Sequence, residues 1–331
     1  MAIEFFTGFE GCGSSDDVEA FFSYVYNLSD ALYSATGGYA NGKCLNISDS
    51  KTQYAVKNVT ASKTKAVGMH INSIGTSGYS TTLLYHLMRF TIGTSYIRIF
   101  NTSGGVEVYR DSTLIASCAE VISSSLVHIE AKLFSNASTG TFQLKINGSL
   151  VIDASDLNTG GSDITSFVIG STNDNAVYYD NIYIADDFQG ELISYMLNPT
   201  SDVTSDFTPS AGSDNYAMVD DDAQDGDTTY VESSTVGHQD LYGYEDAPTN
   251  IDIKAVSIVT VMKEVDPGDR FVRHIANQDA TEYDLTSFGL GSIYPSGGSL
   301  GLFEILNTCP DTTAWTPTKL NAISFGLEIV S

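Results

Sequence analysis

Lysine and arginine are scarce in this sequence of 331 residues. There are 15 of them against 41 aspartates and glutamates, which gives a formal net charge of −26. Residues 146–253 contain no lysine or arginine but hold 21 acidic residues. Nucleic acids are bound mainly through lysine and arginine, so we expect no nucleic-acid partner. The acidic stretch is predicted to face solvent, to hold cations or to meet a basic partner.

Cysteines and long apolar runs are also in short supply. Four isolated cysteines, without a CxxC pair or a histidine at metal-ligand spacing, predict free thiols, with one disulfide as the alternative. No stretch approaches the roughly 18 apolar residues of a membrane helix, so no membrane association is expected. The first residues lack a basic start followed by an apolar run, which predicts a protein without a secretory signal. The cysteines are Cys12, Cys44, Cys118 and Cys309.

Helical periodicity occurs at most once, in residues 16–26, where Val18, Phe21, Phe22 and Val25 have helix-face spacing. Even this segment is compatible with a strand. Most of the remaining sequence alternates with period two and is interrupted by Gly, Asn, Asp and Ser, which is typical of strands and turns. The sequence therefore predicts an all-β protein built from antiparallel β-sandwiches.

The clearest strand pattern lies in residues 126–153. Ile129, Ala131 and Leu133 alternate with polar residues, and a second alternating strand runs to Ile146. Asn147-Gly148 follows directly. Because both residues tolerate the positive φ of a type I′ turn, this dipeptide predicts a tight hairpin.

The length of the chain and a change of composition near residue 188, where Asn, Pro, Ser, Thr and Asp become frequent, predict two domains. We expect a first β-sandwich in residues 1–187, a connector in 188–212 with one short strand at 192–197, and a smaller second β-sandwich in 213–331. Strands are predicted at 251–262 and 323–329. The single tryptophan, Trp315, is predicted to anchor the second domain.

Two sequence features resemble a known family. The D-N-I-Y-I run at residues 180–184 follows the Asn-Gly hairpin and a short strand, and FFTGFEG at residues 5–11 opens the chain. Together they resemble the concanavalin A-like lectin/glucanase (laminin G-like) jelly roll over residues 1–187. Along nearly the whole chain, the order of motifs resembles virion structural proteins of tailed bacteriophages.

The resemblance implies a function as well as a fold. It implies a non-enzymatic component of a phage particle, namely a capsid decoration protein, a head fibre or a tail-attached protein. Such a protein would be assembled in the bacterial host cytoplasm, would contact other virion proteins and would form a homo-oligomer. The alternative is a carbohydrate-binding module for adsorption to host-surface glycans. A glycan depolymerase is a third and less favoured hypothesis.

Catalytic patterns are missing. Glycoside hydrolases need two carboxylates about 5 Å apart, and the nearest match, Glu264 and Asp266, precedes Pro-Gly and is interpreted as a solvated loop. We therefore predict no enzymatic activity. The histidines are dispersed, and His70, His86 and His128 are predicted to be structural.

The remaining candidates concern calcium and glycans. Asp220, Asp222, Asp225 and Asp227 are hard oxygen ligands around a glycine, so they predict either a Ca²⁺ site or a solvated acidic loop. A second acidic group brackets the predicted strand at 177–184. It consists of Asp174, Asp180, Asp186 and Asp187.

A sugar-binding site is predicted from aromatic rings beside an acid. Tyr178, Tyr179 and Asp180 have this chemistry, although tyrosine is also ordinary in a packed sheet.

Overall fold

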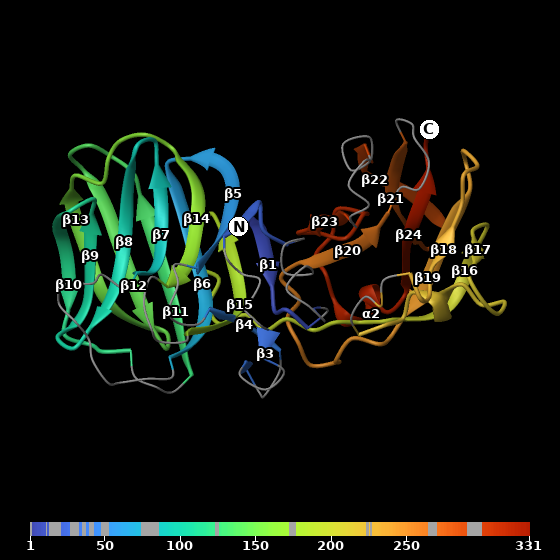
Figure 1. Ribbon diagram of the computed structural model, residues 1–331, viewed down its shortest axis with the longest axis horizontal. Helices are drawn as coiled ribbons and strands as arrows, with labels where there is room; N and C mark the ends of the chain where they lie inside the picture. The colour runs from blue at the N-terminus through green and yellow to red at the C-terminus, as the bar shows by residue number, and fades with distance from the viewer. Residues whose placement is uncertain are drawn as a thin grey trace. The chain divides into compact units, whose positions relative to one another are not determined.

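A computed structural model describes most of the chain. Within the described residues the chain is almost entirely β-strand, and its helical elements include η3 (Tyr216–Met218) and α2 (Pro317–Leu320) (Figure 1). The prediction of an all-β protein is confirmed. The described residues are 2–10, 12, 21–26, 33–34, 38–39, 43–47, 53–73, 86–122, 126–171, 177–222, 225, 227–263, 270–289 and 300–331.

The chain divides into two compact units, Met1–Tyr195 and Met196–Ser331. Each unit has its own sheets and its own buried residues.

The first unit contains an eight-stranded antiparallel sheet. Its order is β13-β12-β11-β6-β15-β4-β3, and β1 pairs with β15. The first strand of the chain is thus held against the last strand of the unit. The strands are β1 (Ile3–Thr7), β3 (Tyr33–Ser34), β4 (Cys44–Ile47), β6 (Thr64–Ser73), β11 (Val127–Phe134), β12 (Gly140–Ile146), β13 (Ser149–Leu157) and β15 (Val177–Ala185).

A seven-stranded sheet in the order β10-β9-β8-β7-β14-β5-β2 forms the other layer of the sandwich (Figure 1). The helical reading of residues 16–26 is wrong for 24–26, which pair with β5 as a strand, and residues 13–20 lie outside the described part. The strands are β2 (Tyr24–Tyr26), β5 (Gln53–Ser62), β7 (His86–Ile92), β8 (Ser95–Thr102), β9 (Gly105–Arg110), β10 (Thr113–Cys118) and β14 (Ile164–Ser171).

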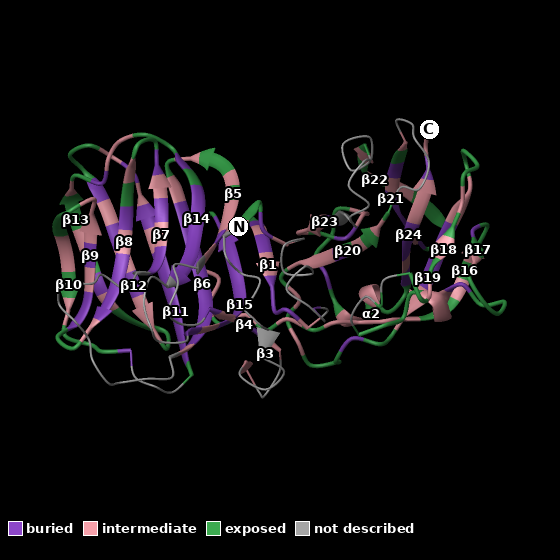
Figure 2. Cartoon of the chain, in the orientation of Figure 1, coloured by how far each residue is buried: buried purple, intermediate pink, exposed green. Residues whose placement is uncertain are grey.

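Large apolar side chains fill the space between these two sheets. Phe5, Met69, Phe90, Phe142 and Tyr179 are all fully buried, and buried residues line the inner strands of both layers in Figure 2. Each buried side chain of this size contributes about 1.5–3 kcal/mol relative to exposure. The period-two pattern of the sequence thus produces a jelly-roll β-sandwich.

The hairpin predicted at residues 126–153 is confirmed. β11 pairs with β12 and β12 with β13. Asn147 and Gly148 have φ values of 48° and 77°, as a type I′ turn requires.

The second unit is a smaller β-sandwich. Its five-stranded sheet has the order β16-β19-β24-β21-β22, and β20 and β23 form a separate pair, as do β17 and β18. Trp315 lies in a buried cluster with Ile258 of β20 and Phe325 of β24, as predicted for the anchor of this unit. The strands are β16 (Pro199–Ser205), β17 (Thr208–Pro209), β18 (Val231–Glu232), β19 (Gln239–Tyr244), β20 (Val256–Met262), β21 (Phe271–Gln278), β22 (Thr281–Gly289), β23 (Leu300–Leu306) and β24 (Ile323–Ile329).

The predicted connector at 188–212 differs from the structure in one respect. The expected strand at 192–197 is absent, and residues 199–205 instead form β16, which pairs with β19 of the second unit. The sequence PTSDVTS has no alternating apolar pattern, so it did not predict a strand. The strand is stabilised by pairing with β19 and not by an apolar face.

None of the four cysteines forms a disulfide, and three of them are buried. No helix in the described part of the chain is both long and apolar enough to cross a membrane.

Candidate functional site

A row of polar side chains crosses the outer face of the eight-stranded sheet. His128 of β11 lies opposite His70 of β6, which in turn lies opposite Asp180 of β15. Residues directly opposite each other share a face, and successive residues alternate. Because Met69 and Ile129 face the core, this row points away from it.

A second row lies beside the first, two residues away on β6 and β11 and three residues away on β15, where the register shifts. Lys145 of β12, Glu130 of β11, Gly68 of β6 and Tyr183 of β15 are in register. The Tyr183 hydroxyl donates a hydrogen bond to Glu130 across the strand between them. A Cβ atom on Gly68 would lie 2.1 Å from the Tyr183 ring, so only glycine permits this arrangement.

Residues 187–191, the covering segment, lie over the second row. The Gly190 N–H donates to Glu130 Oε1 at 2.8 Å, and the Gln189 N–H donates to the Tyr183 hydroxyl at 3.0 Å. Glu191 reaches the first row, where its carboxylate lies 2.9 Å from His70 Nε2.

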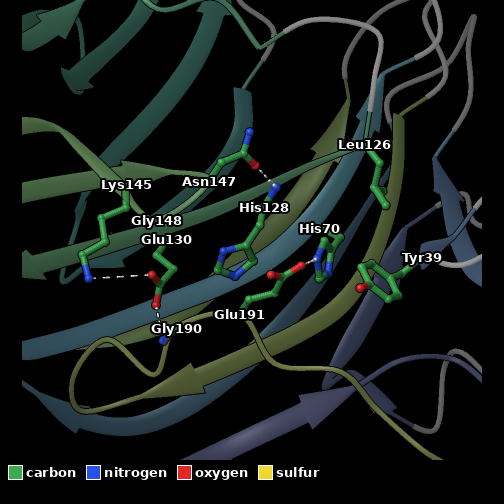
Figure 3. A pocket seen from close by; sticks show the side chains of 10 residues that line it. All are labelled: Tyr39, His70, Leu126, His128, Glu130, Lys145, Asn147, Gly148, Gly190 and Glu191. Carbon is green, nitrogen blue, oxygen red and sulfur yellow. Dashed lines mark hydrogen bonds and ion pairs between the residues drawn. The ribbon is translucent and has the colours of Figure 1, made fainter.

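A pocket of about 470 Å³ lies at this place (Figure 3). Its size falls within the usual range for small-molecule sites, roughly 300–1,000 Å³. Most of its lining can donate or accept hydrogen bonds. The lining residues are Tyr39, His70, Leu126, His128, Glu130, Lys145, Asn147, Gly148, Gly190 and Glu191.

The two histidines of the pocket are buried but incompletely bonded. Their ring centroids are 5.1 Å apart, and their exposed fractions are 2% for His70 and 6% for His128. Within the described structure, His70 Nδ1 and His128 Nε2 have no hydrogen-bond partner. Burial, followed by the neighbouring His70, lowers the pKa of His128. A neutral imidazole with a vacant hydrogen-bonding position is therefore present at neutral pH.

Tyr39 forms the aromatic side of the pocket. Its ring centroid is 4.7 Å from that of His70, and its backbone N–H donates to Asp180 Oδ2 at 2.7 Å. Burial raises the pKa of Asp180 to about 7, although hydrogen bonds from Tyr39 and Asn181 act in the opposite direction. Asp180 thus positions Tyr39, the aromatic residue of the pocket, through the hydrogen bond from its backbone N–H.

The predicted sugar platform of Tyr178, Tyr179 and Asp180 is wrong in its central residue. Tyr179 is fully buried in the core and donates its hydroxyl hydrogen to Leu87 O at 3.0 Å. Tyr178 is half-buried and lies on the face of β15 opposite to that of Tyr179, because adjacent residues of a strand alternate between its two faces. Asp180 is beside the pocket, but it bonds backbone groups.

Of the predicted calcium ligands, Asp220 is exposed and the other three have separate partners. Asp222 accepts from Asn198, Asp225 accepts from Thr229, and Asp227 pairs with Lys263. In the part of the chain described, their oxygens do not converge on a common point.

The second acidic group is also dispersed. Asp187 pairs with Lys132 at 2.7 Å, and Asp186 accepts from the Ala2 N–H. Asp174 lies outside the described residues.

One group of acids does converge, on the sheet of the second unit. Carboxylate oxygens of Glu282, Asp284 and Glu328 lie within 4.8 Å of one another. Arg273 forms ion pairs with both Asp284 and Glu328. A guanidinium already supplies the positive charge there, so this group is an ion-pair network.

Sequence reasoning missed the pocket because it treated His70 and His128 as satisfied structural residues. Alternation alone places His128 and Glu130 on one face, but the pairing of β11 with β6 is needed to bring His70 beside them. The other sequence candidates, Glu264 and Asp266, and the side chain of His86 lie outside the described residues.

No protein-family model and no curated protein matches the chain. Solved structures resemble it in fold at low identity. Alginate lyase Aly36B is 14% identical with a TM-score of 0.40, and the match covers 57% of this chain and 98% of that chain. The carbohydrate-binding module CBM66 from Bacillus subtilis is 14% identical with a TM-score of 0.32, covering 43% and 84%. The carbohydrate recognition domain of Emp46p is 12% identical with a TM-score of 0.34, covering 44% and 83%. Likeness at this level concerns the sandwich architecture and carries no functional argument.

Proposed function

We propose that the first unit is a glycan-binding module and that a sugar ring binds in the pocket beside Tyr39. The observation that carries the proposal is the pair of buried, unpartnered ring nitrogens on His70 and His128. A buried polar atom without a partner costs about 1–3 kcal/mol. A ligand with several hydroxyl groups would satisfy both nitrogens at once.

The rest of the pocket suits the same ligand. Tyr39 provides an aromatic face for the C–H side of a sugar ring, and Glu191 and Lys145 provide an acceptor and a donor. Glu191 is half-exposed at the pocket, with 52% of its side chain accessible. It can therefore exchange its contact with His70 for a sugar hydroxyl without a large conformational change.

We infer binding without hydrolysis. Glycoside hydrolysis needs one carboxyl group as an acid and a second as a base or nucleophile. Glu130 already accepts hydrogen bonds from Tyr183 and Gly190 and faces Lys145 at 3.9 Å. These three partners hold Glu130 as a structural carboxylate.

Calorimetric titration of the full chain with a panel of neutral oligosaccharides tests the proposal. We expect at least one sugar to bind, and Tyr39→Ala and Glu191→Gln each to weaken its binding about tenfold or more. Asp153→Asn is the matched control, because this exposed residue of β13 is bonded to Gln143 and does not line the pocket. Wild-type affinity in the Tyr39 and Glu191 variants, or no binding at all, would refute the pocket. Release of shorter sugars by the wild type would refute the inference of a non-enzymatic module.

The place of the chain in a tailed-phage particle stays a prediction from the sequence, as do assembly in the host cytoplasm, contacts with virion proteins and self-association. We propose that a glycan-binding unit would serve such a particle by adsorbing it to host-surface glycans. Quantitative mass spectrometry of purified particles tests this placement. Absence of the polypeptide from intact particles would contradict it.

A further inference from the structure

Two arginines face each other on the outer side of the seven-stranded sheet. Arg89 of β7 is directly opposite Arg98 of β8. Both point away from the core, because successive residues of a strand alternate and the adjacent Phe90 and Ile97 are buried in the core. Like charges directly opposite one another destabilise a sheet. The facing of two arginines is therefore not explained by their contribution to the stability of the sheet.

Neither arginine is neutralised by a carboxylate among the described residues. Arg98 donates from Nη2 to the backbone carbonyl of Asp111, while Arg89 donates no hydrogen bond. The Nε atoms of both are buried and lack a partner. Glu107, on the same face of β9, accepts from Tyr109 and not from Arg98. Burial lowers the pKa of Arg89, whereas Tyr96 and Tyr54 act in the opposite direction.

Aromatic rings lie on the same face as the arginine pair, one beside Arg89 and two on β2 and β5. The Arg89 guanidinium lies 4.6 Å from the centroid of the Tyr96 ring, and the rings of Tyr24 and Tyr54 are 6.2 Å apart. Tyr24 lies in the same cross-strand row as Arg89, with β5 and β14 between them. Tyr24 is 53% exposed and Tyr96 37% exposed. The face therefore combines accessible rings with a double positive charge.

We propose that this face, the arginine–tyrosine face, binds a carboxylate-bearing sugar of an anionic polysaccharide. The planar guanidinium fork matches a carboxylate in a bidentate manner, and two adjacent forks can hold one carboxylate or two successive ones. The tyrosine rings offer flat surfaces to the sugar rings on either side, which an acidic peptide would leave unused. This site is separate from the neutral-sugar pocket, which lies on the other sheet.

The strong negative charge of the chain does not oppose such binding. Exposed charges separated by more than about 10 Å are largely screened at 0.1 M salt. The site depends on the local pair of arginines, so binding should weaken as salt rises further.

Calorimetric titration of the full chain with a hexamer of galacturonic acid tests the proposal. We expect Arg89→Gln and Arg98→Gln each to weaken binding about tenfold or more, and Arg89→Lys to weaken it less because the charge remains. Arg270→Gln is the control for net charge, since Arg270 lies in the second unit. Asp153→Asn is the control for the other sheet, because Asp153 is an exposed residue of β13 that does not line the pocket. Both controls should bind the hexamer as the wild type does.

Four outcomes of these titrations would overturn the proposal. If maltohexaose bound as tightly as the galacturonic acid hexamer, the arginines would not be recognising a carboxylate. If hexaglutamate bound as tightly as that hexamer, the face would be assigned to an acidic peptide. An unchanged affinity in Arg89→Gln, or absence of binding by the wild type, would remove the site. Thermal unfolding provides an independent check. Arg89→Gln should unfold at the same or a higher temperature, because a like-charge contact is relieved, whereas a markedly lower temperature would show that the pair is structural.

Discussion

At the residue scale, the polar outer face of the eight-stranded sheet depends on the absence of a side chain at Gly68. Tyr183 can reach Glu130 only because Gly68, between them, has no side chain. Glu130 is 1% exposed, so it depends on Tyr183, Gly190 and Lys145 to compensate its burial. A buried carboxylate that lost these partners would destabilise the fold.

Gly68→Ala should therefore destabilise the first unit by about 2–4 kcal/mol, because the ring must move and its hydrogen bond is lost. Urea unfolding followed by circular dichroism measures this change. Gly104→Ala is the matched control, since the nearest atom to its added Cβ is 3.7 Å away. Equal stability of the two variants would show that Tyr183 adapts without cost.

Asp180 predicts a specific dependence on pH. Burial raises its pKa from 3.8 to about 7, so the folded state binds the proton more tightly than the unfolded state. Wild-type stability should therefore fall, relative to Asp180→Asn, as the pH rises from about 4 to about 7. At about 1.4 kcal/mol per pKa unit, the change is roughly 2–4 kcal/mol. Urea unfolding of both proteins across this range measures it, and a pH-independent difference would contradict the raised pKa.

At the scale of elements, the second unit depends on how the β20–β23 pair is attached to its sheet. His274 of β21 is fully buried, with Nδ1 2.9 Å from Glu304 of β23 and Nε2 3.1 Å from Thr260 of β20. Thr286 of β22 also donates to Glu304. One buried polar cluster thus ties four strands together.

Glu304→Gln should destabilise the second unit by about 1–3 kcal/mol, because the bond to His274 loses its charge. Burial by itself raises the pKa of Glu304, but hydrogen bonds from His274 and Thr286 outweigh it and lower the pKa. The contribution of Glu304 is therefore present above pH 4.5 and is lost as the pH falls through the folded-state pKa.

Tryptophan fluorescence measures this effect, since Trp315 is the only tryptophan and packs in the same unit. Glu282→Gln is the control, because this exposed carboxylate should change stability by less than about 0.5 kcal/mol. An equal loss in both variants would mean that burial of the pair is unimportant.

At the scale of the whole molecule, the chain is two units with separate cores. Residues 192–198, which span the boundary between Tyr195 and Met196, belong to no strand. Ile193 and Tyr195 are 40% and 54% exposed. Exposed segments without ladder hydrogen bonds are the usual sites of proteolytic cleavage.

Brief chymotrypsin digestion should cut after Tyr195 and yield fragments of residues 1–195 and 196–331, identified by mass spectrometry. Tyr195→Ser should slow this cleavage several-fold. First cuts within the paired strands at 126–171, or cleavage rates unaffected by the substitution, would contradict the assigned boundary.

Much of the architecture was determined by the sequence. Alternation along β11, β12 and β24 specifies which side chains are buried, because side chains of a strand alternate between two faces. Asn147-Gly148 specifies its turn through local φ preferences. Trp315, the single tryptophan, is buried in the core of the second unit, as its large apolar ring predicts. These features are local, so the neighbouring residues suffice to predict them.

Only the tertiary structure decided which strands became neighbours, and both proposed sites depend on that. β6 and β11 are separated by more than fifty residues, yet their pairing sets His70 against His128. β16 has little apolar character and is a strand only because β19 pairs with it. Tyr179, Tyr178 and Asp180 are adjacent in sequence but are divided between two faces. Register between distant strands is set by the packing of the entire sandwich, which is why local patterns identify the strands but not the sites that the strands assemble.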